Sequence, residues 1–201
     1  MNDSTLHLDR PTHADLARVS ALHDRLAARA SADGLLDVTY RLLDSPVGTL
    51  LVAATPVGLA RVAFASEDHD AVLDLLSRAI GPRVLRDGHT LDEVARELDD
   101  YFAGRRRAFD VPVDLRLARG FRLGVLEHLR EIPYGHTESY AEVAAAAGSP
   151  RAVRAVGSAC ATNPLPVVVP CHRVVRSDGG MGGYLGGVAA KEYLLHLESA
   201  A

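Results

Sequence analysis

Two prolines enclose a short run of valines near the end of the chain and restrict how this stretch can fold. Residues 163–176 read Asn-Pro-Leu-Pro-Val-Val-Val-Pro-Cys-His-Arg-Val-Val-Arg. The β-branched valines at 167–169 predict a buried extended segment. Pro170 has no amide hydrogen to give to a neighbouring strand, so the extended segment should end there. The sequence therefore predicts that Cys171 lies at the end of a rigid apolar wall.

His172 and Arg173 follow the cysteine directly and are the residue types that a reactive thiol needs. A cysteine becomes nucleophilic when a base or a positive charge favours its thiolate form. Neighbours in an extended chain point in opposite directions, so Cys171 and His172 touch only if the chain turns; otherwise a water must join them. A cysteine after an apolar run can also be a small buried hydrophobic residue. The local sequence leaves both interpretations open.

The composition is that of a globular protein with few cysteines. The chain has 201 residues, 48% of them hydrophobic, which is enough for one domain or two small ones. No apolar stretch is long enough to cross a membrane and the N-terminus is polar, so we expect a cytoplasmic protein with no membrane contact. Cys160 and Cys171 are the only cysteines, which argues against a disulfide framework and against a zinc site.

The net charge of −4 is unevenly distributed along the chain. Residues 1–115 carry 13 Lys and Arg against 19 Asp and Glu, whereas residues 116–201 carry 9 against 7. Between Glu142 and Asp178 there are arginines but no acidic residue. A local basic face of this kind suits a compact DNA contact, although the charge is too small for tight non-specific binding.

The first half of the chain predicts a helix followed by a small α/β domain. The helix is expected at residues 12–32, with Thr12 as its N-cap, and either packs on its own domain or binds a partner. Three strands should form an antiparallel meander, at residues 38–43, 50–54 and 59–64. Beyond them we expect two helices at residues 68–80 and 90–103, with a short strand at 84–86 between them. An extended connector should follow at residues 109–115. Because no titratable residues gather in this half, we expect it to give structural support.

The second half predicts a mostly helical domain with a helix-turn-helix. Its helices are expected at residues 121–132, 137–147 with Thr137 as the cap, 151–162 and 188–199. Gly148 should end the second of them, while Ser149 and Pro150 begin the third. This third helix is rich in small residues, which suit either tight helix packing or a close approach to DNA. Arg151 and Arg154 lie on one face of it and favour DNA.

The residues Pro-Cys-His-Arg-Val at 170–174 resemble the active-site signature of the O6-alkylguanine-DNA alkyltransferases, the methylated-DNA–protein-cysteine methyltransferases. The resemblance runs from about residue 121 to 198 and, more weakly, back to about residue 37. It implies an α+β fold, with a small N-terminal α/β domain that holds the antiparallel meander at 36–115. A mostly helical C-terminal domain at 116–201 would follow, with the helix-turn-helix and the active-site cysteine. The N-terminal helical extension at 1–35 has no counterpart in the family.

The resemblance also implies a mechanism of DNA repair. Cys171 would take the alkyl group from a flipped-out base irreversibly, so the methylated-DNA–protein-cysteine S-methyltransferase would act once and be consumed. His172 would accept the thiol proton through a water, and Glu198 would orient His172. Asn163 would brace the turn before the cysteine, and Tyr140 would help to rotate and protonate the base. The expected substrate is O6-alkylguanine, with O4-alkylthymine left open, and neither a cofactor nor a metal is expected.

The implied partner is double-stranded DNA, which the recognition helix would enter from the minor groove. Arg154 would fill the space that the extruded nucleotide leaves. Further DNA contacts are implied at Tyr140, Arg122, Ala141, Ser149, Arg151 and Ser177. The base pocket would be lined by Pro166, Val174, Tyr184 and Leu185, the last two in a glycine-dense loop at 179–187. A monomer is expected, with cooperative binding to DNA left open.

Two positions depart from the family pattern. Leu185 stands where many members have serine, and Ser149 stands where many have asparagine. These differences affect the expected contacts to the leaving group and to phosphate rather than the reaction itself. Lys191 matches a family lysine near the pocket.

Three other functions compete with alkyl transfer. A damage sensor that binds the flipped base without accepting the alkyl group would lack Cys171. A helix-turn-helix regulator would carry a more basic recognition helix and would leave the Cys-His-Arg stretch unexplained. A cysteine hydrolase would need an oxyanion hole and an acyl pocket, and no residues of the sequence mark either.

Overall fold

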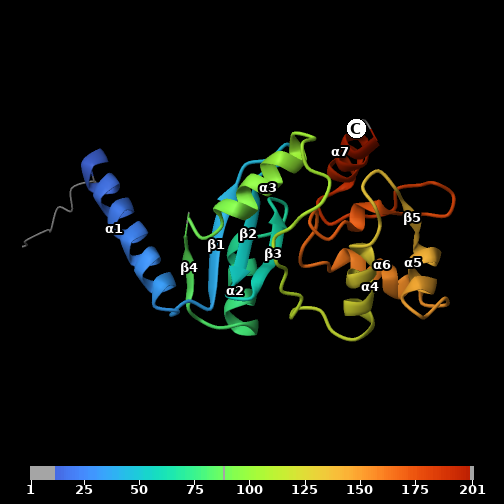
Figure 1. The fold of residues 1–201 in the computed structure, drawn as a ribbon, viewed down its shortest axis with the longest axis horizontal. Coiled ribbons are helices and arrows are strands. Elements are labelled where there is room, and N and C mark those ends of the chain that lie inside the picture. Colours follow the sequence, from blue (N-terminus) through green and yellow to red (C-terminus); the bar gives the residue numbers. More distant parts are fainter. Residues whose placement is uncertain (1–11, 88, 200–201) are drawn as a thin grey trace, which may run out of the picture.

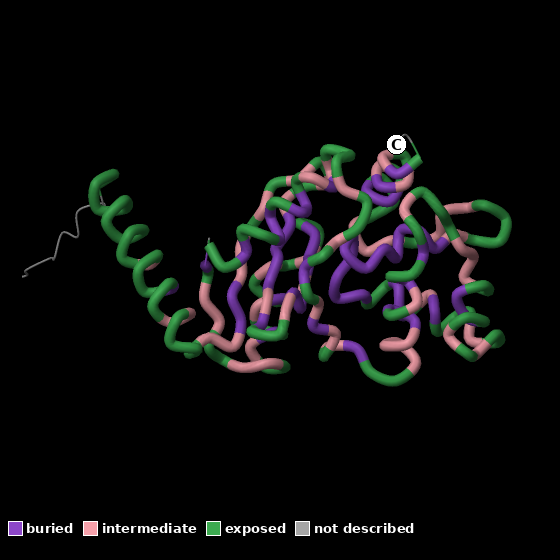
Figure 2. Tube along the Cα trace, in the orientation of Figure 1, coloured by how far each residue is buried: buried purple, intermediate pink, exposed green. Residues whose placement is uncertain are grey.

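The computed structural model describes residues 12–87 and 89–199, with a sheet-containing part and a helical part side by side (Figure 1). Helix α1 (His13–Ala32) begins as predicted at Thr12, in a capping box with Asp15. It projects from the sheet end, and most of it is exposed (Figure 2). Of its residues only Ala27 is buried, and His23 Nε2 lies 2.7 Å from the carbonyl of Arg86. Its apolar stripe therefore faces outward, with Leu16, Val19, Leu22 and Leu26 each more than half exposed.

The predicted antiparallel meander is confirmed. Strands β1 (Val38–Leu43), β2 (Leu50–Thr55) and β3 (Gly58–Phe64) pair in that order, with a register shift between Ala53 and Ala54. The short strand β4 (Val84–Arg86) adds to the other side of β1 in parallel, so the sheet is mixed.

Both faces of the sheet are covered, which explains why β2 is apolar throughout rather than alternating. On one face of the sheet, Leu51 and Ala53 pack in one cluster with Val72 and Leu76 of helix α2 (His69–Ala79). Leu50 and Val52 face the other way, into a core shared with α3 (Asp92–Phe102) and the helical part. This shared core joins the two parts of the chain.

The outer edge of β3 holds two segments that lead to the C-terminal part. The amide of Leu59 donates to the carbonyl of Pro112 at 2.8 Å, and the amide of Val62 donates to the carbonyl of Pro164, also at 2.8 Å. Gly58 is needed at this edge, because a Cβ there would lie 2.4 Å from the carbonyl oxygen of Pro112. Strand β3, in the N-terminal half of the chain, therefore positions residue 164, which lies ahead of the cysteine.

The helical part contains α4 (Phe121–Leu129), α5 (Tyr140–Ala146), α6 (Val153–Ala161) and α7 (Val188–Ser199). Two helix starts in this part are predicted wrongly. Thr137 does not cap α5: Ser139 does, in a capping box with Glu142, because β5 (Glu138–Ser139) is extended and pairs with β6 (Val174–Val175). Helix α6 starts two residues later than predicted, because the amide of Ala152 closes a turn onto the carbonyl of Ser149 at 2.8 Å.

Helix α4 also ends at Leu129 rather than at residue 132, since the chain continues in turns towards Pro133. Gly148 directly follows Ala147, the C-cap of α5, and has a φ of 75°, so it stops the helix as predicted. Within the described residues, no helix has both the length and the apolar character needed to span a bilayer.

Candidate active site

The valine run before the cysteine is a tight turn and not the predicted extended segment. Val167 has a φ of 73°, and the amide of Val169 donates to the carbonyl of Leu165 at 2.7 Å. Asn163 stabilises this turn from inside: its Oδ1 accepts from the amide of Leu165 at 3.0 Å, and its Nδ2 donates to the carbonyl of Val169 at 2.8 Å. A left-handed φ is costly for a β-branched residue, so the buried surroundings must hold Val167 in place.

Cys171 follows this turn at the start of a single turn of 3-10 helix, η1 (Cys171–Arg173). Its Sγ accepts a hydrogen bond from Nδ2 of Asn163 at 3.2 Å, and the residue is buried. Burial raises the pKa of Cys171 to about 11, although the Asn163 bond and the charge of Lys191 oppose the rise. The thiol is therefore protonated near neutral pH and needs a base before it can react.

His172 is placed as that base by Glu198. Nε2 of His172 lies 2.9 Å from Oε1 of Glu198, and both residues are buried. An ionised carboxylate only accepts hydrogen bonds, so Nε2 carries the proton and Nδ1 keeps a free lone pair. Among the described residues, Nδ1 has no hydrogen-bond partner. Burial lowers the pKa of His172 while Glu198 raises it, with a net decrease that favours a neutral imidazole.

The carboxylate of Glu198 accepts five hydrogen bonds. Besides His172, Nε and Nη2 of Arg173 donate to it at 2.9 Å each, the hydroxyl of Tyr101 at 2.7 Å, and the amide of Gly135 at 3.2 Å. Burial raises the pKa of Glu198, but the hydrogen bonds from His172, Arg173 and Tyr101 and the charge of His172 together outweigh burial and hold the pKa well below its ordinary value. The carboxylate is therefore charged throughout the physiological range.

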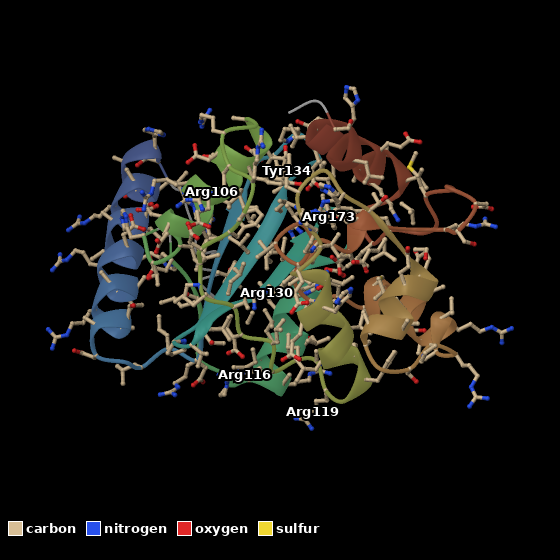
Figure 3. All side chains as sticks on the ribbon, turned by 45° about the vertical axis from the view of Figure 1, so that its right-hand side comes forward. Arg106, Arg116, Arg119, Arg130, Tyr134 and Arg173 are labelled. Atoms are coloured by element: carbon tan, nitrogen blue, oxygen red, sulfur yellow. The ribbon has the colours of Figure 1, made fainter. Side chains whose placement is uncertain are left out.

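Arg173 does not serve the thiol as its sequence position indicated. The turn at η1 directs its guanidinium to Glu198 and, through Nη1, to the carbonyl of Ile132 at 2.6 Å. The guanidinium also lies 5.8 Å from the ring centre of Tyr134, and Figure 3 shows the two side chains together.

Tyr101 is the site residue that sequence reasoning missed. It comes from α3, in the half of the chain that we expected to give structural support alone, and its hydroxyl also lies 3.4 Å from Nε2 of His172. The local sequence contains one signal, a tyrosine within the apolar face of a helix, where a buried hydroxyl requires a partner.

Lys191 fixes the glycine-dense loop against the active site. Its Nζ donates to the carbonyl of Val174 at 2.5 Å and to the carbonyl of Met181. The side chain is fully buried, and burial lowers its pKa. Lys191 therefore ties the loop to β6, which begins directly after η1.

The predicted pocket residues lie around this loop. Pro166 and Val174 are buried, and the ring of Tyr184 meets that of His172 edge-on, with centroids 6.4 Å apart. Tyr140 approaches the same loop, because a Cβ at Gly182 would come within 2.8 Å of its hydroxyl. Leu185 instead lines a cavity of about 370 Å³ that also includes Asn163.

The predicted DNA-contacting residues come from α4, α5, α6 and the loops beside them, and α5 and α6 are neighbours in the helical part (Figure 1). Arg154 is exposed, and Nη1 of Arg122 donates to Oγ1 of Thr162 at 3.3 Å. The others are exposed or half-buried: Ala141, Arg151 and Ser177 are exposed, and Ser149 is half-buried. These placements are compatible with a DNA contact, and the individual contacts stay predictions.

Two family models match nearly the whole chain beyond α1. The model for the 6-O-methylguanine DNA methyltransferase ribonuclease-like domain matches residues 38–115, and the model for the DNA binding domain of the same proteins matches residues 120–200. The chain therefore belongs to the 6-O-methylguanine DNA methyltransferase family, the methylated-DNA–protein-cysteine methyltransferases.

Relatives and solved structures agree with this assignment. A methylated-DNA–protein-cysteine methyltransferase of Methanosarcina barkeri is 38% identical over 162 residues, which cover 79% of this chain and 96% of that protein. The constitutive enzyme of that name from Bacillus subtilis is 36% identical over 160 residues, covering 79% and 94%. The crystal structure of Mycobacterium tuberculosis OGT in complex with DNA matches with a TM-score of 0.71 and 38% identity, covering 81% of this chain and 93% of that one.

Proposed function

We propose that this protein repairs O6-alkylguanine in double-stranded DNA by moving the alkyl group to Cys171 in one irreversible step. The observation that carries the proposal is the buried series from Asn163 through Cys171 and His172 to Glu198, which supplies a thiol, a neutral base and a charged carboxylate. Membership of the methyltransferase family, and the DNA bound to the mycobacterial relative, support the same reaction.

The reaction proceeds in two proton movements and one displacement. Nδ1 of His172 takes the thiol proton through a water, and the resulting thiolate attacks the alkyl carbon. A carbon–sulfur bond forms as the bond between that carbon and O6 of guanine breaks, and the leaving guanine takes up a proton. Burial raises the pKa of Tyr140, so its hydroxyl stays protonated and can donate a hydrogen bond to the leaving guanine. The proton that guanine takes up comes back from the imidazolium of His172 through solvent, so no proton is gained or lost overall. The thioether has no route back to a thiol, so each molecule acts once.

Substrate access requires that the damaged base leave the duplex, because a stacked base cannot bring its O6 substituent to a buried thiol. Helix α6 would enter the minor groove, with Arg154 in the space left by the base. Action on O4-alkylthymine, a monomeric state, cooperative binding, the cytoplasmic location and the division of the chain at residues 35 and 115 stay predictions.

Mass spectrometry of the intact protein tests the proposal after mixing with a duplex that contains one O6-methylguanine. The wild type should gain one methyl group at Cys171, Cys171→Ser should gain none, and Cys160→Ala should gain as much as the wild type. Selective binding of the damaged duplex without a mass gain would support the damage sensor instead. The proposal would be refuted if the wild type showed no mass gain and no selective binding of the damaged duplex.

A further inference from the structure

We propose that Tyr101 of α3 is a positioning residue for alkyl transfer, which holds Glu198, and through it His172, in the orientation that leaves Nδ1 free to act as the base. This inference rests on the proposed function, since the orientation of His172 matters only if that residue deprotonates Cys171. It assigns a part in the chemistry to the N-terminal half of the chain.

The geometry places one carboxylate oxygen between a phenol and an imidazole. Oε1 of Glu198 accepts from the hydroxyl of Tyr101 at 2.7 Å and from Nε2 of His172 at 2.9 Å. The hydroxyl and Nε2 are themselves 3.4 Å apart. Nη2 of Arg173 also donates to Oε1, at 2.9 Å. Because these donors share one oxygen, the position of the phenol limits the directions from which His172 can approach it.

The ring of Tyr101 is firmly fixed, as a positioning residue requires. It is fully buried, and its centroid lies 5.5 Å from that of Phe102, 5.2 Å from Phe109 and 6.1 Å from Tyr134. Phe102 in turn meets Tyr193 of α7 at 6.4 Å, so α3 packs directly on the helix that carries Glu198. The hydroxyl therefore has a defined place relative to the carboxylate.

Several charged or titratable groups surround His172. They are Tyr101 of α3, Cys171 and Arg173 of η1, Tyr184 of the loop, and Lys191 and Glu198 of α7. Burial and the neighbouring Glu198 raise the pKa of Tyr101, so its hydroxyl keeps its proton and remains a donor.

Loss of the Tyr101 hydroxyl has a defined sign. Oε1 would then accept more strongly from the Nε2–H of His172, which stabilises the imidazolium and raises the pKa of His172. The pH below which the base is protonated and inactive would move upward. A tyrosine that only fills the core would change stability without moving this pH.

Tyr101→Phe removes the hydroxyl and keeps the ring contacts, and Tyr134→Phe is the matched control. The hydroxyl of Tyr134 donates to the carbonyl of Leu197 at 3.2 Å and not to the carboxylate. Two measurements on the full-length protein are needed. One is the pH titration of His172 by NMR; the other is single-turnover transfer from a duplex with O6-methylguanine, at several protein concentrations and pH values.

For Tyr101→Phe we expect the titration of His172 to move upward by about half a unit or more. The transfer rate at saturating protein should fall about three- to tenfold, part of the hundredfold or more that a general base contributes. The affinity for DNA should not change, and Tyr134→Phe should behave like the wild type in all three respects.

An unchanged His172 titration in Tyr101→Phe, or a rate that falls only in proportion to unfolded protein, would overturn the inference. The proposed function fails in a different way, namely if the wild type transfers no alkyl group. The NMR titration does not depend on transfer, so it still decides whether Tyr101 sets the state of His172.

Discussion

Replacing Glu198 by Gln should strongly destabilise the protein, because the carboxylate balances a buried positive charge. The side chain of Glu198 is 1% exposed and that of Arg173 is 8% exposed. In Glu198→Gln the guanidinium keeps its charge and loses its partner, and the amide nitrogen of Gln would face donors of Arg173 or Gly135. Breaking a buried ion pair from one side costs about 3–5 kcal/mol. For a domain of this size that lowers Tm by about 6–20 °C.

The pH dependence of unfolding gives a second, independent measure of the same change. The pKa of Glu198 is far lower in the folded protein than in the unfolded chain, so its stabilising effect is complete above about pH 5 and is lost as the pH falls further. Urea unfolding from pH 7 down to pH 3 should therefore show a steeper loss of stability for the wild type than for Glu198→Gln. Glu192→Gln is the control, since Glu192 is an exposed residue of α7.

Two results would refute this account of Glu198. One is a free energy of unfolding for Glu198→Gln within about 1 kcal/mol of the wild type at pH 7, the range of ordinary surface substitutions. The other is a pH dependence identical to that of the wild type. The Glu192→Gln control should stay within about 0.5 kcal/mol at every pH, because its removal leaves no buried charge unpaired.

Two further predictions concern the loop and the base. Gly186→Ala should destabilise the protein by about 1–3 kcal/mol, because the added Cβ would lie 2.6 Å from the ring of Phe64. Gly183→Ala is the control, since a Cβ there would have no atom within 4 Å. Urea unfolding of both variants measures the difference. The transfer rate should hold from pH 8 to below pH 6.5, because burial lowers the pKa of His172 below its ordinary value. A rate that is already half-maximal at pH 6.5 in single-turnover assays would contradict this.

The elements that sequence patterns predicted well are those with local chemical causes. Thr12 and Asp15 form a capping box three residues apart, and a turn ends at Gly148 because only glycine adopts its φ freely. The cap of α5 was missed although its signal is present, since Ser139 and Glu142 have the same spacing as that first capping box. In that case the sequence was sufficient and Thr137 was the wrong choice.

The active-site turn shows a limit of pattern reasoning. A short β-branched run reads as a buried strand, yet Val167 adopts a left-handed φ because the side chain of Asn163 satisfies the backbone groups that a neighbouring strand would otherwise pair. The contact between Tyr101 and Glu198 spans 97 residues, so no local pattern carries it. The same holds for Arg173, whose direction depends on the 3-10 turn and on the place of α7.

The N-terminal half of the chain holds both ends of the buried series that runs from Asn163 through Cys171 and His172 to Glu198. At one end, the amide of Val62 and the guanidinium of Arg61 in β3 donate to the carbonyl of Pro164, at 2.8 and 3.3 Å, just ahead of the turn that Asn163 stabilises. At the other end, Tyr101 of α3 donates to Glu198. The thiol and its base lie between these two anchors, on segments of the C-terminal half. Their relative position therefore depends on how the two halves pack, which makes the sheet and α3 part of the geometry of alkyl transfer.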